Sequence, residues 1–319
     1  MAELFPDIEP YDHGMLDTGD GNRLYWECCG NPDGIPALVL HGGPGSGCST
    51  GARRYFDPSV YRIILFDQRN CGRSLPNAAD QDCDLFGNTT WHLVADIERL
   101  RAYLGVDRFV LFGNSWGTTL ALAYAESQPR NVAAMVLAGI TTTRRSEIDW
   151  LCTGMARFFP REYADFTQSI PDDLAPLAYY NGLLNSTDPA ERQVAAVAWH
   201  RWEAASILLA DPNGLPRRWA DARYLLTRAR IVTHYFHHDA WLSDRQLLQG
   251  AAALAGIPGI LIQGRFDLEA PLVTAWELHQ SWPGSELVIV ENAAHSTDNA
   301  GISAEIVAAT AKILHFFKK

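Results

Sequence analysis

The chain has 319 residues, 47% of them apolar and 20% charged, a composition that suits a globular protein with one large domain carrying an insertion, or two domains. Its net charge of −11 argues against nucleic acid or an anionic membrane as a partner, because both require a basic surface. No signal peptide or membrane-spanning run is recognisable, and the six cysteines lack a C-x-x-C spacing, so we expect free thiols and a cytoplasmic location.

The first elements are short strands. Residues 15–28 alternate around Asp20-Gly21 and predict a hairpin, and residues 37–40 and 62–67 are continuous apolar runs typical of strands covered on both faces. The run at 37–40 leads into HGGPGSG at residues 41–47. Small residues leave backbone N–H groups free to face a developing negative oxygen, which favours an oxyanion loop over a flexible surface loop.

A packing helix is expected next. Apolar residues recur at steps of four, three and four from Leu93 to Leu104, with Thr90 as the predicted N-cap and Gly105 as the end.

Residues 110–119 are the most informative stretch of the chain. An apolar strand ends in G-N-S-W-G at residues 113–117 and continues at once into a helix-like segment. This is the pattern of a nucleophile elbow, in which a strained turn presents Ser115 at the end of a sheet. Another strand is predicted at residues 133–137.

After residue 139 the alternation of strands and helices stops and resumes near residue 256. The intervening segment is helical in pattern and rich in aromatic residues. We therefore predict an α/β fold with a mostly parallel, doubly wound sheet, built from residues 1–140 and 256–319, with residues 141–255 as an inserted helical cap.

The last strands are each followed by a residue with catalytic potential. A strand at 259–263 precedes Asp267, and a strand at 286–290 precedes His295. A serine hydroxyl needs an imidazole to accept its proton and a carboxylate to orient that imidazole. Ser115, Asp267 and His295 follow the chain order of α/β-hydrolases, with Glu269 as the alternative to Asp267. The N–H groups of Gly43 and Trp116 would then face the oxyanion.

The sequence resembles the prolyl aminopeptidase (proline iminopeptidase) family of α/β-hydrolases over nearly its whole length. The resemblance rests on HGGPGSG at 41–47, DQRNCGRS at 67–74, GNSWGTTLALAYA at 113–125, GRFD at 264–267 and AHS at 294–296. It implies the release of an N-terminal proline from a short peptide through an acyl-enzyme. No cofactor or metal is expected, since the histidines at 234, 237 and 238 lack acidic or cysteine partners at suitable spacing.

The resemblance also implies that glutamates of the cap hold the substrate's ammonium group. Glu203 matches one such position, and Gly42, Trp202 and Tyr235 are expected beside the substrate. A second glutamate is expected where this chain has Val232, which cannot hold an ammonium.

Two alternatives therefore remain open at this point. One is an amidase or esterase acting on an uncharged or N-blocked substrate. The other is a homologue that only binds a ligand, against which the complete set of Ser115, Asp267 and His295 argues.

Overall fold

The computed structural model describes residues 3–210 and 214–317. Within these residues, eight strands form one sheet in the order β1-β2-β4-β3-β5-β6-β7-β8. β2 pairs antiparallel with β1 and β4, whereas the other neighbouring strands are parallel, so the predicted mostly parallel sheet is confirmed. The strands are β1 (Asp12–Asp17), β2 (Arg23–Gly30), β3 (Ile35–Leu40), β4 (Tyr61–Phe66), β5 (Phe109–Asn114), β6 (Val132–Ala138), β7 (Gly259–Gly264) and β8 (Glu286–Val290).

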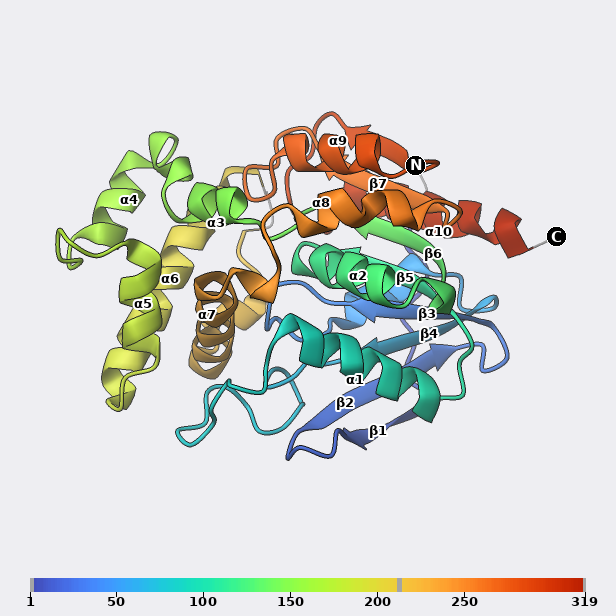
Figure 1. Ribbon diagram of the computed structural model, residues 1–319, viewed down its shortest axis with the longest axis horizontal. Helices are drawn as coiled ribbons and strands as arrows, with labels where there is room; N and C mark the ends of the chain where they lie inside the picture. The colour runs from blue at the N-terminus through green and yellow to red at the C-terminus, as the bar shows by residue number, and fades with distance from the viewer. Residues whose placement is uncertain (1–2, 211–213, 318–319) are drawn as a thin grey trace.

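Helices cover the sheet and form a separate group beside it (Figure 1). The α-helices are α1 (Thr90–Tyr103), α2 (Trp116–Ser127), α3 (Arg145–Cys152), α4 (Pro160–Thr167), α5 (Pro176–Leu184), α6 (Pro189–Ala210), α7 (Ala222–His237), α8 (Gln246–Gly250), α9 (Leu272–Ser281) and α10 (Ala300–Ile313). The 3₁₀ helices are η1 (Thr50–Tyr55), η2 (Pro129–Asn131), η3 (Gly154–Arg157), η4 (Arg217–Ala220), η5 (Asp239–Trp241), η6 (Ala251–Leu254) and η7 (Leu314–Phe317). None of the helices in the described residues is long and apolar enough to span a membrane.

Both faces of the sheet are buried, and successive strand residues alternate between them. In β3, Leu38 and Leu40 pack with side chains of α1, α2, α8 and α9, whereas Ala37 and Val39 pack with α10 and η1. This two-sided burial explains why the central strands are continuous apolar runs rather than alternating ones.

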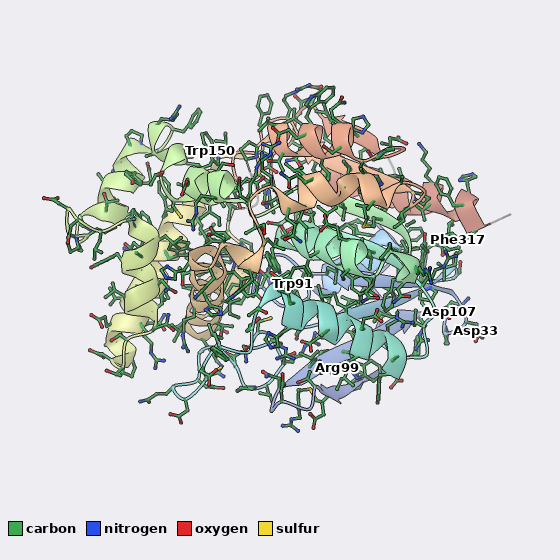
Figure 2. All side chains as sticks on the ribbon, in the orientation of Figure 1. Asp33, Trp91, Arg99, Asp107, Trp150 and Phe317 are labelled. Carbon is green, nitrogen blue, oxygen red and sulfur yellow. The ribbon has the colours of Figure 1, made fainter. Side chains whose placement is uncertain are left out.

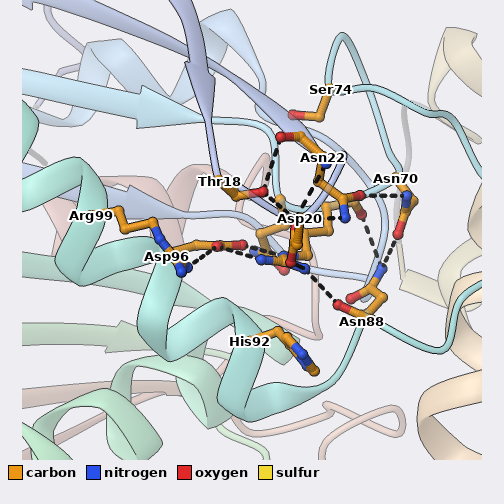
Figure 3. Close-up of polar contacts among 12 residues, drawn as sticks. Thr18, Asp20, Asn22, Asn70, Ser74, Asn88, His92, Asp96 and Arg99 are labelled. Carbon is orange, nitrogen blue, oxygen red and sulfur yellow. Dashed lines mark hydrogen bonds and ion pairs between the residues drawn. The ribbon is translucent and has the colours of Figure 1, made fainter.

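A buried polar network ties the antiparallel edge of the sheet to α1 (Figure 3). The Arg69 guanidinium is fully enclosed and donates to Asp96 of α1 at 2.6 Å and to Asp20, in the turn between β1 and β2, at 2.7 Å. Asn70 extends the network by donating to Asn22 at 3.2 Å. The charged segment after β4 therefore joins the turn between β1 and β2 to α1.

The start of α1 differs from the prediction by one residue. Thr89 is the N-cap, because its hydroxyl accepts from the His92 N–H, whereas the Thr90 hydroxyl donates to the carbonyl oxygen of Ala240. The capping hydroxyl and its neighbour are both threonines, so composition alone does not distinguish them.

The group of helices beside the sheet has an aromatic core of its own. Phe166 of α4 stacks on Trp202 of α6 and on Tyr180 of α5, with ring centroids 5.4 and 4.5 Å apart. Leu247 and Leu254, by contrast, pack in the same cluster as α2 and the sheet. The cap boundaries at 141 and 255 stay a prediction, and we propose from this packing that the cap ends nearer residue 241.

Candidate active site

Ser115 lies at the sharp turn between β5 and α2. Its backbone has φ 53° and ψ −127°, a conformation that L-residues rarely adopt. The turn is held by hydrogen bonds from the Ser115 N–H to Ala138 at 3.0 Å and from the Thr118 N–H and hydroxyl to the Ser115 carbonyl at 2.8 and 2.7 Å. A Cβ on Gly117 would overlap the carbonyl oxygen of Leu40, so the close approach of α2 to β3 requires glycine there.

Asp267 and His295 form a hydrogen-bonded pair beyond the ends of β7 and β8. The Asp267 carboxylate accepts from His295 Nδ1 at 2.8 Å and from Gln263 at 2.7 Å on one oxygen, and from the backbone N–H groups of Glu269 and Ala270 at 3.0 and 2.8 Å on the other. These bonds fix the orientation of the carboxylate. Because His295 Nδ1 is bonded to it, Nε2 is the nitrogen that can accept a proton. Within the described residues, Ser115 and His295 make no direct hydrogen bond, although both line one pocket.

Two carboxylates set the charge of His295. Burial alone would lower its pKa, but the charges of Asp267 and of Glu269 outweigh burial and raise the pKa to about 9. Glu269 Oε2 lies 3.8 Å from His295 Nε2. Burial also raises the pKa of Glu269, against the opposing charge of His295.

A buried network connects the HGG loop to the residue after the serine. The Gln68 N–H donates to His41 Nε2 at 3.0 Å, so Nδ1 carries the proton and donates to the Gly42 carbonyl at 2.9 Å. Burial lowers the pKa of His41 to about 4, which keeps the ring neutral. The Gln68 side chain also donates to the His41 carbonyl and accepts from the Trp116 indole at 2.9 Å. Gln68 thereby holds together the two segments that carry Gly43 and Trp116.

The predicted oxyanion donors lie next to the serine. Trp116 is the first residue of α2, so its N–H has no partner within the helix. Gly43 and Trp116 both line the pocket that contains Ser115. A Cβ on Gly42 would lie 3.2 Å from the Ser115 Cβ, which shows how closely the loop packs against the serine. Gly42 itself lines a neighbouring cavity that also contains Ser115.

The pocket lies between the sheet and the helices that follow β6, and its space of about 720 Å³ includes a part open to solvent. Its apolar wall comes from α3, η3, α6 and α7 and consists of Ile148, Leu151, Cys152, Met155, Trp199, Trp202 and Phe236. Its carboxylates are Glu147, Glu203 and Glu269, and Arg228 also lines it. A pocket of this character suits a small, largely apolar group that carries a charge.

The structure brings Trp202 and Glu203 to the pocket but not Val232 or Tyr235. Val232 is fully enclosed in the aromatic cluster of the cap. Tyr235 turns away, packing edge-on against Trp116 and donating its hydroxyl to Asn88 at 2.7 Å. That these two side chains lie beside the substrate stays a prediction; in this structure neither lines the pocket, because each is fully buried against protein.

Sequence reasoning missed Arg228. It lies on α7, one helical turn before Val232, and its guanidinium forms an ion pair with Glu203. The same guanidinium lies over the Trp219 ring, 5.6 Å from its centroid, and donates to the Ser46 hydroxyl at 3.3 Å. The available signal was an arginine four residues before the position at which the resemblance implies a second glutamate.

Trp150, labelled in Figure 2, connects α3 to the loop that carries Asp267. Its indole N–H donates to the carbonyl oxygen of Leu268 at 2.7 Å. The loop between Asp267 and Glu269 is thus held from both the sheet side and the cap side.

Residues 36–297 match the family model of the alpha/beta hydrolase fold. The chain is therefore an α/β-hydrolase. A protein named probable proline iminopeptidase from Streptomyces coelicolor is 48% identical over 316 residues, which cover 97% of this chain and 97% of that protein. A proline iminopeptidase from Xylella fastidiosa is 44% identical over 302 residues, covering 93% of this chain and 94% of its own length. The chain belongs to the proline iminopeptidase family.

The crystal structure of a proline iminopeptidase from Mycobacterium smegmatis has the same fold. It is 18% identical, with a TM-score of 0.67 and coverage of 96% of this chain and 98% of that one. The fold class and the family expected from sequence are both confirmed.

Proposed function

We propose that this protein is a prolyl aminopeptidase that releases an N-terminal proline, or a small apolar residue, from short peptides and amides. The observation that carries the proposal is that Ser115 and His295, the latter bonded to Asp267, line a pocket that also has an apolar wall and several carboxylates. Such a pocket suits a pyrrolidine ring that carries a free ammonium. The identity to relatives named proline iminopeptidase supports this choice of substrate.

In the acylation step, Ser115 Oγ bonds to the carbonyl carbon of the N-terminal residue while its proton passes to Nε2 of neutral His295. Asp267 keeps the proton on Nδ1 and stabilises the imidazolium that forms. The carbonyl oxygen becomes an oxyanion and accepts from the N–H groups of Gly43 and Trp116, each worth about 3 kcal/mol of the barrier. His295 then gives its proton to the leaving nitrogen as the C–N bond breaks.

In the deacylation step, water takes the place of the departed amine. Its oxygen bonds to the acyl carbon as its proton passes to His295 Nε2. The bond from the carbon to Ser115 Oγ then breaks, and the serine recovers its proton from His295. The free amino acid leaves, and the protein returns to its starting state.

We place this activity in the cytoplasm, with short peptides as the partners. The six cysteines are free thiols, which supports a reducing compartment.

The test compares prolyl p-nitroanilide with its N-acetylated form. We expect kcat/KM to favour the free amine by at least about 30-fold, since an unpaired buried charge commonly costs about 2–5 kcal/mol. Ser115→Ala should lower kcat by about 10⁴-fold or more. Ser127→Ala, an exposed serine at the end of α2, is the matched control and should retain full activity.

A fluorophosphonate probe should label the wild-type protein and Ser127→Ala but not Ser115→Ala. Equal or faster turnover of the N-acetylated substrate would refute the aminopeptidase proposal and indicate a hydrolase of blocked substrates.

A further inference from the structure

An aminopeptidase must bind a charged group directly beside the bond that it cleaves. In the N-terminal residue the nitrogen and the attacked carbonyl carbon are two bonds apart, about 2.5 Å from each other. The attacking oxygen approaches that carbon to about 3 Å. The carboxylate that holds the ammonium must therefore lie close to Ser115 and His295.

Glu147 lines the pocket but is already saturated with partners. It accepts from the hydroxyls of Thr141, Thr142 and Thr274 and from the Thr142 N–H, at 2.8–3.0 Å, and pairs with Arg144 at 3.1 Å. Its charge is compensated before any substrate arrives.

Glu203 is compensated as well. Its carboxylate forms the ion pair with Arg228, whose guanidinium is also held by Ser46 and Trp219. An ammonium would have to displace a fixed guanidinium to reach this carboxylate, and would meet a positive charge beside it.

Glu269 differs from both because its nearest cation is the titratable imidazole of His295 rather than a fixed guanidinium. Its Oε1 faces the hydroxyl of Ser206 at 3.3 Å, but that single proton can go instead to the carbonyl of Glu203 at 3.0 Å. Among the described residues its Oε2 makes no hydrogen bond, and it lies 3.8 Å from His295 Nε2. The bond from its N–H to Asp267 holds the backbone in place.

We propose that Glu269 is the carboxylate that binds the ammonium of the substrate's N-terminal residue. Its free oxygen lies beside the nitrogen that accepts the serine proton, which is where the length of an amino acid requires the ammonium to lie. The chain thus supplies, from the loop after Asp267, the second acidic group that Val232 cannot provide. This inference rests on the proposed aminopeptidase function.

Binding of the ammonium at Glu269 also favours the neutral form of His295. The charged groups around Glu269 are His295, Asp267, Glu203 and Arg228. A substrate ammonium on Glu269 neutralises the carboxylate that favours the imidazolium, and so releases the neutral base. Substrates with a free amine then promote their own acylation.

The experiment uses two substrates that differ only in the amine. Cyclopentanecarbonyl p-nitroanilide has a CH₂ group where prolyl p-nitroanilide has its charged nitrogen. The ratio of their kcat/KM values therefore measures recognition of the ammonium, and any general change in catalysis cancels.

We expect Glu269→Gln to lower this ratio by at least about 30-fold. Glu269→Asp, which keeps the charge, should retain a ratio closer to the wild type. The double variant Glu203→Gln/Arg228→Gln removes the neighbouring ion pair as a unit and should change the ratio by less than about threefold, whatever happens to the individual rates.

A wild-type preference for the prolyl substrate that persists in Glu269→Gln would overturn this inference alone. The inference also fails if the double variant loses the preference while Glu269→Gln keeps it, because Glu203 would then bind the ammonium. A wild-type ratio near one would overturn both the inference and the proposed function.

Discussion

The pH dependence of Ser115 reactivity follows from the charges around His295. Its pKa, raised to about 9, means that the charged form predominates at pH 7 and that the neutral form, which alone can accept the serine proton, is a minor fraction. Because the shift favours the charged form, reactivity should rise about tenfold per pH unit below pH 9 and level off above it.

The size of the Glu269 contribution can be worked out from the 3.8 Å separation of Glu269 Oε2 and His295 Nε2. At that distance a full charge contributes about 1 kcal/mol in a water-like medium and about 4 kcal/mol at an effective dielectric constant of 20. These energies correspond to about 1 to 3 pKa units. Glu269→Gln should therefore lower the apparent pKa from about 9 to between about 6 and 8.

The assay is inactivation by phenylmethanesulfonyl fluoride, which is uncharged and reacts at Ser115. Its second-order rate constant between pH 5.5 and 10.5 reports the free protein without interference from a substrate amine. Glu291→Gln is the matched control, since this carboxylate is exposed and paired with Arg265. A wild-type profile already level at pH 7.5, or a Glu269→Gln profile that superimposes on the wild type, would refute the reasoning.

Two further substitutions test the buried hydrogen bonds of Gln68 and the buried ion pairs of Arg69. Gln68→Leu removes the two side-chain bonds, to the His41 carbonyl and from the Trp116 indole, that join these residues. We expect kcat to fall about 10- to 100-fold with little change in KM on prolyl p-nitroanilide; a rise in KM alone would contradict this. Arg69→Met leaves the buried Asp96 with only its longer contact to Arg99, at 3.4 Å, and should lower the free energy of unfolding by about 3–5 kcal/mol in urea titration. A loss below about 1 kcal/mol would mean that the network in Figure 3 contributes little.

The core of the site could be predicted because its signals are local. A strand, a turn with glycines and a helix are adjacent in sequence around Ser115, and Asp267 and His295 each follow a recognisable strand. The fold rules for open sheets then bring these strand ends together. No contact between distant segments has to be known.

The specificity residues could not be placed in this way. Whether Val232 or Arg228 faces the substrate depends on how α7 packs against α6, and the ion pair between Arg228 and Glu203 joins two helices. Periodicity assigns residues to one face of a helix but does not say which neighbour covers that face. From the sequence, Glu269 is only an alternative to Asp267, because its distance from His295 Nε2 is a property of the folded loop.

The position of β6 in the sheet has a consequence for synthesis on the ribosome. β6 is a buried apolar strand whose outer neighbour is β7, and the chain makes α3 to α8 between the two. Until β7 emerges, the outer edge of β6 has no partner and can pair with another nascent chain. A polypeptide whose translation stops within these helices contains Ser115 but neither Asp267 nor His295. It also exposes the unpaired edge of β6. Such a fragment would be prone to aggregate and would lack two of the three residues predicted for catalysis.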